Sequence, residues 1–332
     1  MPAWVVPAFI ASTVISLVAS HRLVKALESL GARWAAPQVL LGLVAALAAD
    51  GPELTSAVAA QLDGQHSIGV GVLFGSNVFN IAALLGVGAI VAGSVRFHRR
   101  AVLLEGTAAL GVAAGSVLLV EGSLPVGVCA AVTAAFFVPY VVVVAVPSRR
   151  LPLPEAVRDW LATAVREEGE DLEGGYPAST LRSARREGLI AVSAVLVVVV
   201  ASAVMEHSAS VGGEALGAPA VVVGAVVLAA VTSLPNLVAA VYLAGAGKGA
   251  AMLSEAMNSN TLNVVGGLVL PAVLVGVGAG HLSAGGQLTV WAYAAMTVAA
   301  LGLGLAGRGM SRTVGAVLAG AYVAFLAALL AL

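Results

Sequence analysis

The sequence is poor in charged residues, and this alone excludes most classes of soluble protein. Only 10% of the 332 residues are Asp, Glu, Lys or Arg, whereas 60% are apolar. The mean hydropathy is +1.02, so most of the chain cannot face water as the surface of a globular protein does. The composition predicts an integral membrane protein. Its 39 glycines fit close helix packing in lipid, where small side chains let backbones approach.

The sequence has a single cysteine and no basic residues before its first apolar stretch. The single Cys129 excludes a disulfide within the chain, and its apolar surroundings favour a structural thiol over a reactive one. A secretory signal peptide would place basic residues before the first apolar stretch, but Arg22 and Lys25 follow it. We therefore expect the first apolar segment to remain as a helix.

Long apolar runs, by contrast, recur along the whole chain. A membrane-crossing helix needs about 20 apolar residues, and ten such spans can be placed at residues 4–20, 38–61, 67–92, 101–120, 124–147, 188–206, 217–244, 249–279, 286–306 and 312–331. They predict an all-α membrane protein of ten transmembrane helices, with two five-helix repeats at 1–147 and 188–332 joined by a linker at 148–187. Because each repeat has an odd number of helices, the second must enter the membrane inverted relative to the first.

The basic residues support this count. All sixteen Lys and Arg lie after an odd-numbered span, and therefore on one face. By the positive-inside rule that face is cytoplasmic, which puts the linker inside and both termini outside the cell membrane. The linker combines an amphipathic run at 157–165 with the acids Glu167, Glu168, Glu170, Asp171 and Glu173. We expect a short interfacial helix and a solvated acidic segment, without the Asp-x-Asp-x-Asp-Gly spacing of a calcium-binding loop.

One motif occurs twice, 183 residues apart and without a gap. Eight residues of the first copy recur at this offset: Pro52, Leu54, Ala57, Val58, Gly64, Ser76, Asn77 and Asn80 match Pro235, Leu237, Ala240, Val241, Gly247, Ser259, Asn260 and Asn263. Chance matches of Ala or Val are common, but a proline and a Ser-Asn-x-x-Asn group at a shared offset are not. Polar repeats inside apolar sequence, each with a helix-breaking proline, predict two broken-helix halves of one ion site, as in secondary transporters.

Two carboxylates lie near the middle of the second predicted span. Asp50 and Glu53 would each cost about 2.5–3.5 kcal/mol there, and no Lys or Arg lies in the interior of any span. A bound cation or a proton is then the natural counter-charge. Pro52 breaks the helix, so we expect the carbonyls of residues 47–49, and of 228–232 in the second copy, to face a ligand. Such oxygen donors suit Na+ and Ca2+.

Each of these residues also has a purely structural interpretation. A proline can simply kink a helix, and Ser and Asn side chains join helices by hydrogen bonds. For any one of these residues alone, the structural interpretation is as good as ion binding. For Asp50 and Glu53 together with both polar repeats, ion binding is favoured. Glu105 lies near two arginines at a predicted cytoplasmic helix end, where snorkelling is favoured. Glu255 has no basic neighbour in sequence besides Lys248, so a structural role and a role as an ion or proton site both stay open.

The two motifs resemble the alpha repeats of the sodium/calcium exchanger family, within the cation/calcium antiporter superfamily. The resemblance rests on Ala49-Asp50-Gly51-Pro52-Glu53 with Gly75-Ser76-Asn77-Val78-Phe79-Asn80, and on Thr232-Ser233-Leu234-Pro235-Asn236 with Asn258-Ser259-Asn260-Thr261-Leu262-Asn263. It implies an exchanger-like fold and a cation-binding role for Ser76, Asn77, Asn80, Thr232, Ser233, Ser259, Asn260 and Asn263. To this set of candidate ligands we add Asp50, Glu53 and Asn236, with Glu255 as an open candidate.

The chain departs from the family pattern beside both prolines. Family members usually read Thr-Ser-x-Pro-Glu in both repeats, whereas this chain has Ala49 and Asp50 in the first and Asn236 in place of glutamate in the second. Asp50 would restore the count of carboxylates to two, both now on the first repeat. Two carboxylates neutralise one divalent cation, while the empty, doubly negative site is held back by its desolvation cost, which would enforce exchange.

These observations predict a secondary active cation antiporter without a cofactor, which exchanges Ca2+ for Na+ by alternating access. Exchange of Ca2+ or another cation for H+ is the near alternative, and a transport-dead membrane scaffold stays open because both motifs are altered. An intramembrane hydrolase is disfavoured, because all five histidines fall at span ends and Asp50 has no second intramembrane aspartate. We therefore expect no enzyme, with inorganic cations and the lipid bilayer as partners and no nucleic acid. The sequence leaves the oligomeric state open.

Overall fold

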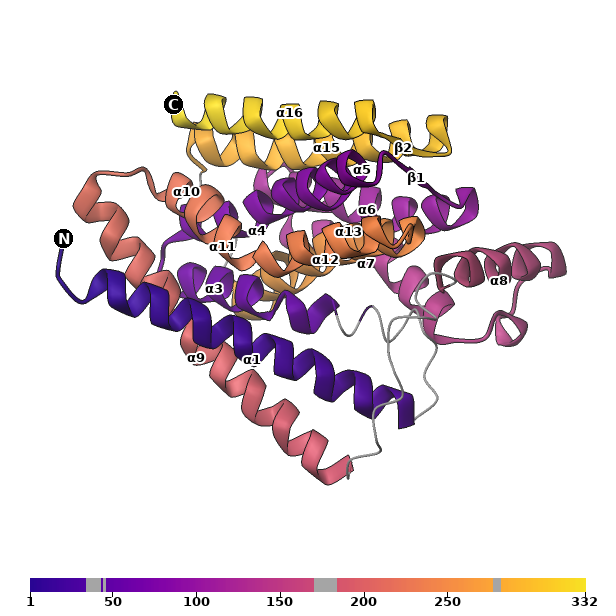
Figure 1. The fold of residues 1–332 in the computed structure, drawn as a ribbon, viewed down its shortest axis with the longest axis horizontal. Coiled ribbons are helices and arrows are strands. Elements are labelled where there is room, and N and C mark those ends of the chain that lie inside the picture. Colours follow the sequence, from indigo (N-terminus) through magenta and orange to yellow (C-terminus); the bar gives the residue numbers. More distant parts are fainter. Residues whose placement is uncertain (34–42, 44–45, 170–183, 277–281) are drawn as a thin grey trace.

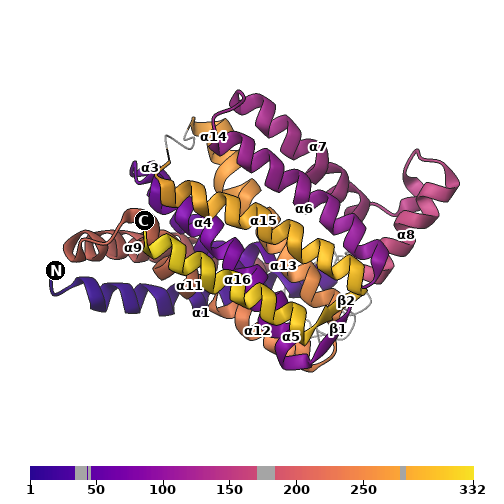
Figure 2. The same ribbon diagram turned by 90° about the horizontal axis from the view of Figure 1, so that it is seen from above.

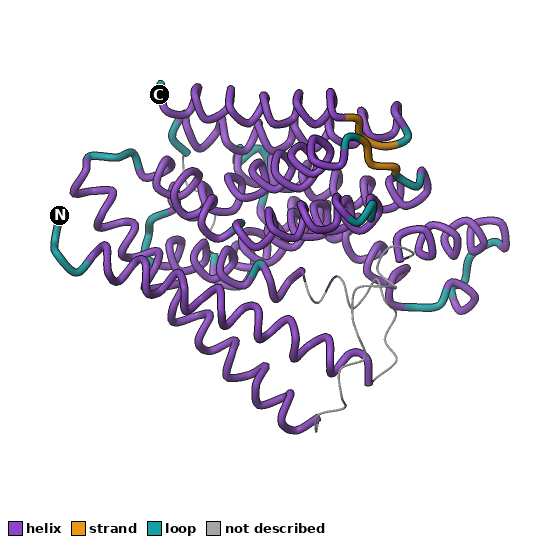
Figure 3. Tube along the Cα trace, viewed as in Figure 1, coloured by secondary structure: helices purple, strands orange, loops and turns teal. Residues whose placement is uncertain are grey.

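The protein is helical almost throughout. The computed structural model describes residues 1–33, 43, 46–169, 184–276 and 282–332 (Figure 1, Figure 3). In the first half the helices are α1 (Val5–Arg33), α3 (Gly51–Leu62), α4 (His66–Asn80), α5 (Gly88–Ala92), α6 (Arg99–Val120) and α7 (Val126–Ala145). A π-helical stretch, η1 (Ile81–Val87), joins α4 to α5 without a break.

The second half follows a connecting helix. A 3-10 turn, η2 (Ser148–Arg150), precedes the connecting helix α8 (Glu155–Gly169). The later elements are α9 (Ala184–Leu216), α10 (Ala220–Val222), η3 (Val223–Leu228), α11 (Ala229–Thr232), α12 (Leu234–Gly245), α13 (Gly249–Val264), η4 (Val265–Val269), α14 (Leu270–Val275), α15 (Ala284–Gly307) and α16 (Arg312–Leu330). Two short strands, β1 (Ser94–Arg96) and β2 (Gly309–Ser311), pair antiparallel and join the end of α5 to the α15–α16 connection.

Eight helical runs in the described part of the chain are long and apolar enough to cross a membrane. They match the first, third to sixth and eighth to tenth predicted spans, which confirms the all-helical membrane class. The two others are the second and the seventh, which carry the motif prolines Pro52 and Pro235. The seventh is present as α10 to α12, with a shorter apolar helical run at Ala220–Thr232. The second falls partly outside the described residues and continues as α3. The count of ten spans and the inversion stay predictions.

The predicted first span, 4–20, is too short. Helix α1 continues to Arg33, and Leu23 and Ala26 on its extension are buried against Ala48, Ala191 and Ala194. Basic residues that were expected in a loop therefore lie on a helix. Helix α9 is longer than its predicted span for the same reason, because its extension packs along α1. Figure 1 shows this pair along one edge of the molecule, with α15 and α16 along the opposite edge.

Helix α4 lies at the centre, where glycine allows two backbones to touch. Seen from above, α15 and α16 cross over it, while α6 and α7 form one flank and α8 stands at the far end (Figure 2). A Cβ at Gly75 would approach the Ala225 backbone to 2.5 Å, and one at Gly71 would approach it to 2.9 Å. No larger side chain fits there without movement. This contact fixes the position of the Ser-Asn-x-x-Asn group of α4 along the axis of the neighbouring η3.

The linker contains the expected amphipathic helix. In α8, Leu161 and Ala164 are buried, and Arg100 of α6 lies 3.5 Å from Glu167. Because this contact is exposed, it contributes little to stability. The acids expected at Glu170, Asp171 and Glu173 lie outside the described residues.

Candidate cation-binding site

Ser20 of α1 caps the break in the first copy of the motif. Pro52 brings no amide hydrogen to the carbonyl of Ala48, four residues earlier. The Ser20 hydroxyl donates to that carbonyl at 2.6 Å and to Ala49 O at 3.1 Å. Two of the three carbonyls at 47–49 that are predicted to face a ligand therefore also accept a hydrogen bond from α1.

The second copy engages its carbonyls locally. The Thr232 hydroxyl donates to Leu228 O at 2.9 Å, and the Ser233 amide donates to Ala229 O at 3.0 Å. Of the carbonyls expected to face a ligand at 228–232, these two are satisfied within their own helix. Side chains, rather than unbonded carbonyl groups, therefore provide most of the polar groups of the candidate site.

Glu53 is held at the centre by side chains from the second half. Its Oε1 accepts a hydrogen bond from Ser233 Oγ at 2.5 Å, and its Oε2 accepts one from Asn263 Nδ2 at 2.6 Å. The hydroxyl groups of Ser76 and Thr232 also face this carboxylate. Glu53 is 0% exposed. It is thus the point at which both copies of the motif meet.

Asp50 faces the asparagine that stands in for the second glutamate. Asn236 Nδ2 lies 3.3 Å from Asp50 Oδ1 and 3.3 Å from Asn80 Oδ1. The Ser259 hydroxyl also faces Asp50, and the Glu53 carboxylate lies within electrostatic range. The residue that replaces the lost glutamate and the aspartate expected to compensate for it are therefore in contact.

The two Ser-Asn-x-x-Asn groups pair with each other. Asn77 Nδ2 donates to Asn260 O at 3.2 Å, and Asn260 Nδ2 donates to Asn77 O at 3.1 Å. Asn80 Nδ2 reaches Ser259 Oγ at 3.0 Å, and Asn263 Nδ2 reaches Asn77 Oδ1 at 3.1 Å. Helices α4 and α13 are thus joined by reciprocal bonds between equivalent residues.

All eleven predicted ligands come together in one buried cluster. None is more than 3% exposed: Asp50, Glu53, Ser76, Asn77, Asn80, Thr232, Ser233, Asn236, Ser259, Asn260 and Asn263. Among the described residues, no ion pair neutralises either carboxylate of this cluster. Asp50 Oδ2 and Asn263 Oδ1 are buried without a hydrogen-bond partner among those residues. Buried oxygens of this kind require a partner, and a hard cation supplies one.

The structure also places the two other acids considered in the sequence, Glu255 and Glu105. Glu255, one turn before Ser259 on α13, lies within electrostatic range of Asp50. The described residues hold no group of three Asp, Glu, His or Cys side chains able to share one metal ion, so Glu255 adds negative charge without completing such a group. Glu105, expected to snorkel, is instead 2% exposed within α6, because α13 and α15 pack over it.

Sequence reasoning missed several side chains that support the cluster. Ser56 Oγ lies 3.4 Å from the Ser202 carbonyl, and Gln61 Nε2 donates to Gly267 O at 2.8 Å. Tyr140 donates to Asn258 Oδ1 at 2.7 Å. The polar residues at spacings of four along the predicted first span, Ser12, Ser16 and Ser20, were an available signal for a buried helix face. The partners of Ser16 and Ser20, which are Ser202 and the carbonyls of Ala48 and Ala49, lie far away in sequence and were not predictable.

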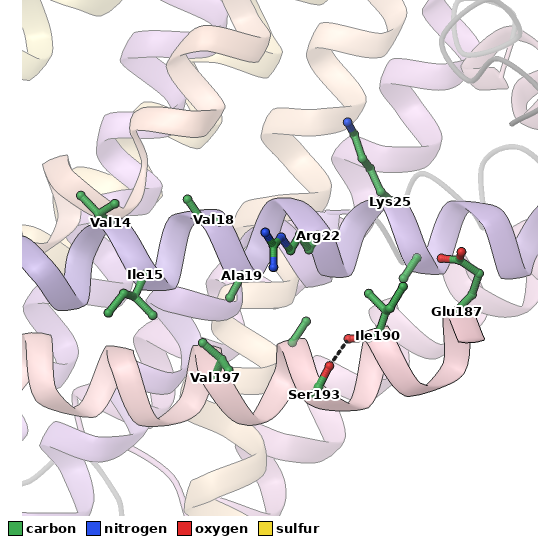
Figure 4. Close-up of a pocket in the computed structure, with 12 residues that line it drawn as sticks. Val14, Ile15, Val18, Ala19, Arg22, Lys25, Glu187, Ile190, Ser193 and Val197 are labelled. Atoms are coloured by element: carbon green, nitrogen blue, oxygen red, sulfur yellow. Dashed lines mark hydrogen bonds between the residues drawn. The ribbon is translucent and has the colours of Figure 1, made fainter. Parts of the chain in front are cut away.

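A separate cavity of about 610 Å³ lies between α1 and α9. Apolar side chains such as Val18 and Val197 line its walls, and Arg22, Lys25 and Glu187 lie toward one end (Figure 4). It contains no residue of either motif. The cavity is therefore distinct from the candidate cation site.

Comparison with known proteins agrees with this geometry. The model of a family described as sodium/calcium exchanger protein matches residues 4–148 and 188–331. The chain belongs to the sodium/calcium exchanger family. It is 27% identical over 270 residues to the inner membrane protein YrbG of Escherichia coli (strain K12), covering 80% of this chain and 78% of that protein. It is accordingly a multi-pass membrane protein of a cation exchanger family.

Solved exchanger structures have the same fold. The H+/Ca2+ exchanger CAX superposes with a TM-score of 0.71 at 13% identity, covering 98% of this chain and 86% of that one. The sodium-calcium exchanger NCX_Mj superposes with a TM-score of 0.61 at 19% identity, covering 98% and 99% of the two chains. At these identities the likeness concerns the fold. The chemistry of transport has to be argued from the residues of this chain.

Proposed function

We propose that this protein is a secondary active antiporter that exchanges Ca2+ for Na+ by alternating access at the cluster around Glu53 and Asp50. One observation carries the proposal: two buried carboxylates from the first half are enclosed by hydroxyl and amide groups of the second, with no ion pair to them among the described residues. A cation of matching charge neutralises both carboxylates. The desolvation cost of the empty, doubly negative cluster opposes its passage between the two faces, so movement is coupled to occupancy.

The two halves act in this proposal as inverted repeats, residues 1–147 and 188–332, with the cytoplasmic linker 148–187 between them. The reciprocal bonds between Asn77 and Asn260 support it, because each residue makes the same contact with the other. The family match also falls into two segments on either side of this linker.

Exchange of Ca2+ for H+ is the second candidate, favoured by one observation. Glu255 places a third acidic side chain within electrostatic range of Asp50. An additional carboxylate near a two-carboxylate site gives protons a place to bind when the divalent cation leaves. The Na+ and H+ candidates differ in the gradient that drives Ca2+ movement.

Purified protein in sealed vesicles separates the candidates. We expect Ca2+ uptake driven by an imposed Na+ gradient, and abolished in Glu53→Gln, which removes charge but keeps size. Glu155→Gln, on the linker helix, is the matched control and should transport as wild type. Uptake driven by a proton gradient alone would establish the second candidate. If neither gradient moves Ca2+, and Ca2+ does not stabilise the purified protein, the transport-dead scaffold is the remaining candidate.

A further inference from the structure

Helix α9 carries a polar stripe on the face that packs against the first half. Ser202, Glu206 and Ser210 are spaced by four residues, so they lie on one side of the helix. Ser202 Oγ lies 2.8 Å from Ser16 Oγ of α1, and its carbonyl lies 3.4 Å from Ser56 of α3. Both contacts fix this face of α9 against α1 and α3.

The other end of the stripe is fixed equally well. Ser210 Oγ accepts a hydrogen bond from Gln65 Nε2 at 2.8 Å. Glu206 lies between the two fixed serines, about 6 Å along the axis from Ser202. Its side chain therefore enters the same interface between α9 and the first half.

Glu206 is a buried acid whose hydrogen bonding is incomplete. It is 1% exposed, and its Oε1 is buried without a hydrogen-bond partner among the described residues. The acid within electrostatic range is Asp63, which is exposed at the end of α3. No ion pair to Glu206 exists in the described part of the chain. Burial of an uncompensated carboxylate is costly, and its free oxygen requires a partner.

A line of polar groups connects Glu206 with the central cluster. Ser56 follows Glu53 by three residues on α3 and is also fully buried. Asp63 follows Ser56 by seven residues, which places it on the same side of α3. The order from the centre outward is thus Glu53, Ser56 with Ser202, and then Glu206 with Asp63.

The charge of the proposed outer face suits a cation. In the inverted topology all sixteen Lys and Arg lie on the opposite face, so Asp63 and Glu206 meet no Lys or Arg from the loops on their own side. A mouth lined by one sign of charge raises the local concentration of the opposite ion.

We infer that Glu206, with Asp63, forms a second cation-binding site, called the station here, at the outer end of this line of polar groups. At the station Ca2+ or Na+ loses part of its water before it reaches Glu53. The inference rests on the proposed function. Two carboxylates without a third acidic ligand make a weak site, which a transit station requires, because the ion has to leave it again.

Transport measured from each side tests the station. In vesicles with external CaCl2, Glu206→Gln should raise the external Ca2+ concentration at half-maximal rate by about tenfold, as expected for loss of one charge-assisted contact. The value measured from the cytoplasmic side should stay unchanged. Glu206→Asp should restore most of the external affinity. Glu214→Gln, an exposed acid two turns further along α9, is the matched control and should match wild type on both sides.

A binding measurement keeps the test independent of transport. In the Glu53→Gln background, calorimetry with CaCl2 should show residual weak binding, which the additional Glu206→Gln change removes. Equal binding in these two variants would overturn the station, as would an equal shift in affinity on both sides of the membrane. Absence of Ca2+ transport in the wild type, with the residual binding still present, would overturn the proposed function alone.

Discussion

At the scale of single residues, the proposed site has both of its central carboxylates, Asp50 and Glu53, on the first half of the chain. Asp50 and Asn236 are in contact, at 3.3 Å, across a sequence separation of 186 residues. The two side chains therefore lie at the same part of the cluster, although the family pattern would put the acid at position 236 on α12 instead of position 50. The hypothesis that follows is that the site preserves the total negative charge of the cluster, rather than the position of the acid in the chain.

This relocation predicts a compensating pair of substitutions. Asp50→Ser should abolish Ca2+ transport by halving the central charge, and the added change Asn236→Glu should restore it. Residues that share one site give non-additive effects of this kind. Initial rates in vesicles measure the outcome, with Asn236→Glu alone as the control. A double variant no better than Asp50→Ser would show that the two positions are not exchangeable.

The clustering of the eleven candidate residues was predictable because their chemistry is visible in the chain itself. Polar and acidic side chains inside apolar spans have to find partners, and the offset of 183 residues already paired the two copies. The supporting contacts were not predictable. Ser20 reaches Ala48 and Ala49, and Ser56 reaches Ser202, through helix packing that no local pattern encodes.

At the scale of elements, α1 is tied to the first broken helix by one hydroxyl group. Loss of this bond should free the segment around the break. Ser20→Ala should lower the free energy of unfolding by about 1 kcal/mol and speed hydrogen exchange at residues 48–54. Ser12→Ala is the matched control, because Ser12 bonds only carbonyls of its own helix. Equal exchange in both variants would show that Ser20 does not hold the break.

The contact between α4 and η3 should be sensitive to a single methyl group. Gly75→Ala places a Cβ against the Ala225 backbone and should destabilise the protein by about 1–3 kcal/mol through overpacking. Gly302→Ala in α15, where no atom lies within 4 Å of the added carbon, should be neutral or slightly stabilising. Thermal unfolding in detergent measures both. A Gly75→Ala protein as stable as wild type would mean that the two backbones separate easily.

Helix existence was predicted better than helix length. The apolar pattern located eight spans, but α1 and α9 run well beyond their predicted ends because each covers the other. The extension of α1 looks polar in sequence, since basic side chains alternate with Leu23 and Ala26. Pairing between distant helices, rather than local hydropathy, determines where these helices end.

At the scale of the whole molecule, the predicted inverted topology would put equivalent loops on opposite sides of the membrane. The loop at 63–66 should face outside, and the loop at 245–249, at the corresponding place in the second repeat, should face the cytoplasm. Single cysteines introduced at Asp63 and Gly247, in a Cys129→Ala background, should differ in labelling by an impermeant thiol reagent applied to cells. Equal labelling from outside would contradict the inversion, whatever the ion transported.

The reciprocal bonds between Asn77 and Asn260 have a consequence for the origin of the chain. A contact in which two equivalent residues exchange the same bond is what a half-turn axis produces at the interface of a homodimer. The predicted inverted repeat would give each half the surface that one subunit presents in such a dimer. The motifs have since diverged, because a dimer of first halves would bring four motif carboxylates together and a dimer of second halves none. The two halves are no longer interchangeable, so covalent linkage within one gene ensures that each is always made with its only working partner.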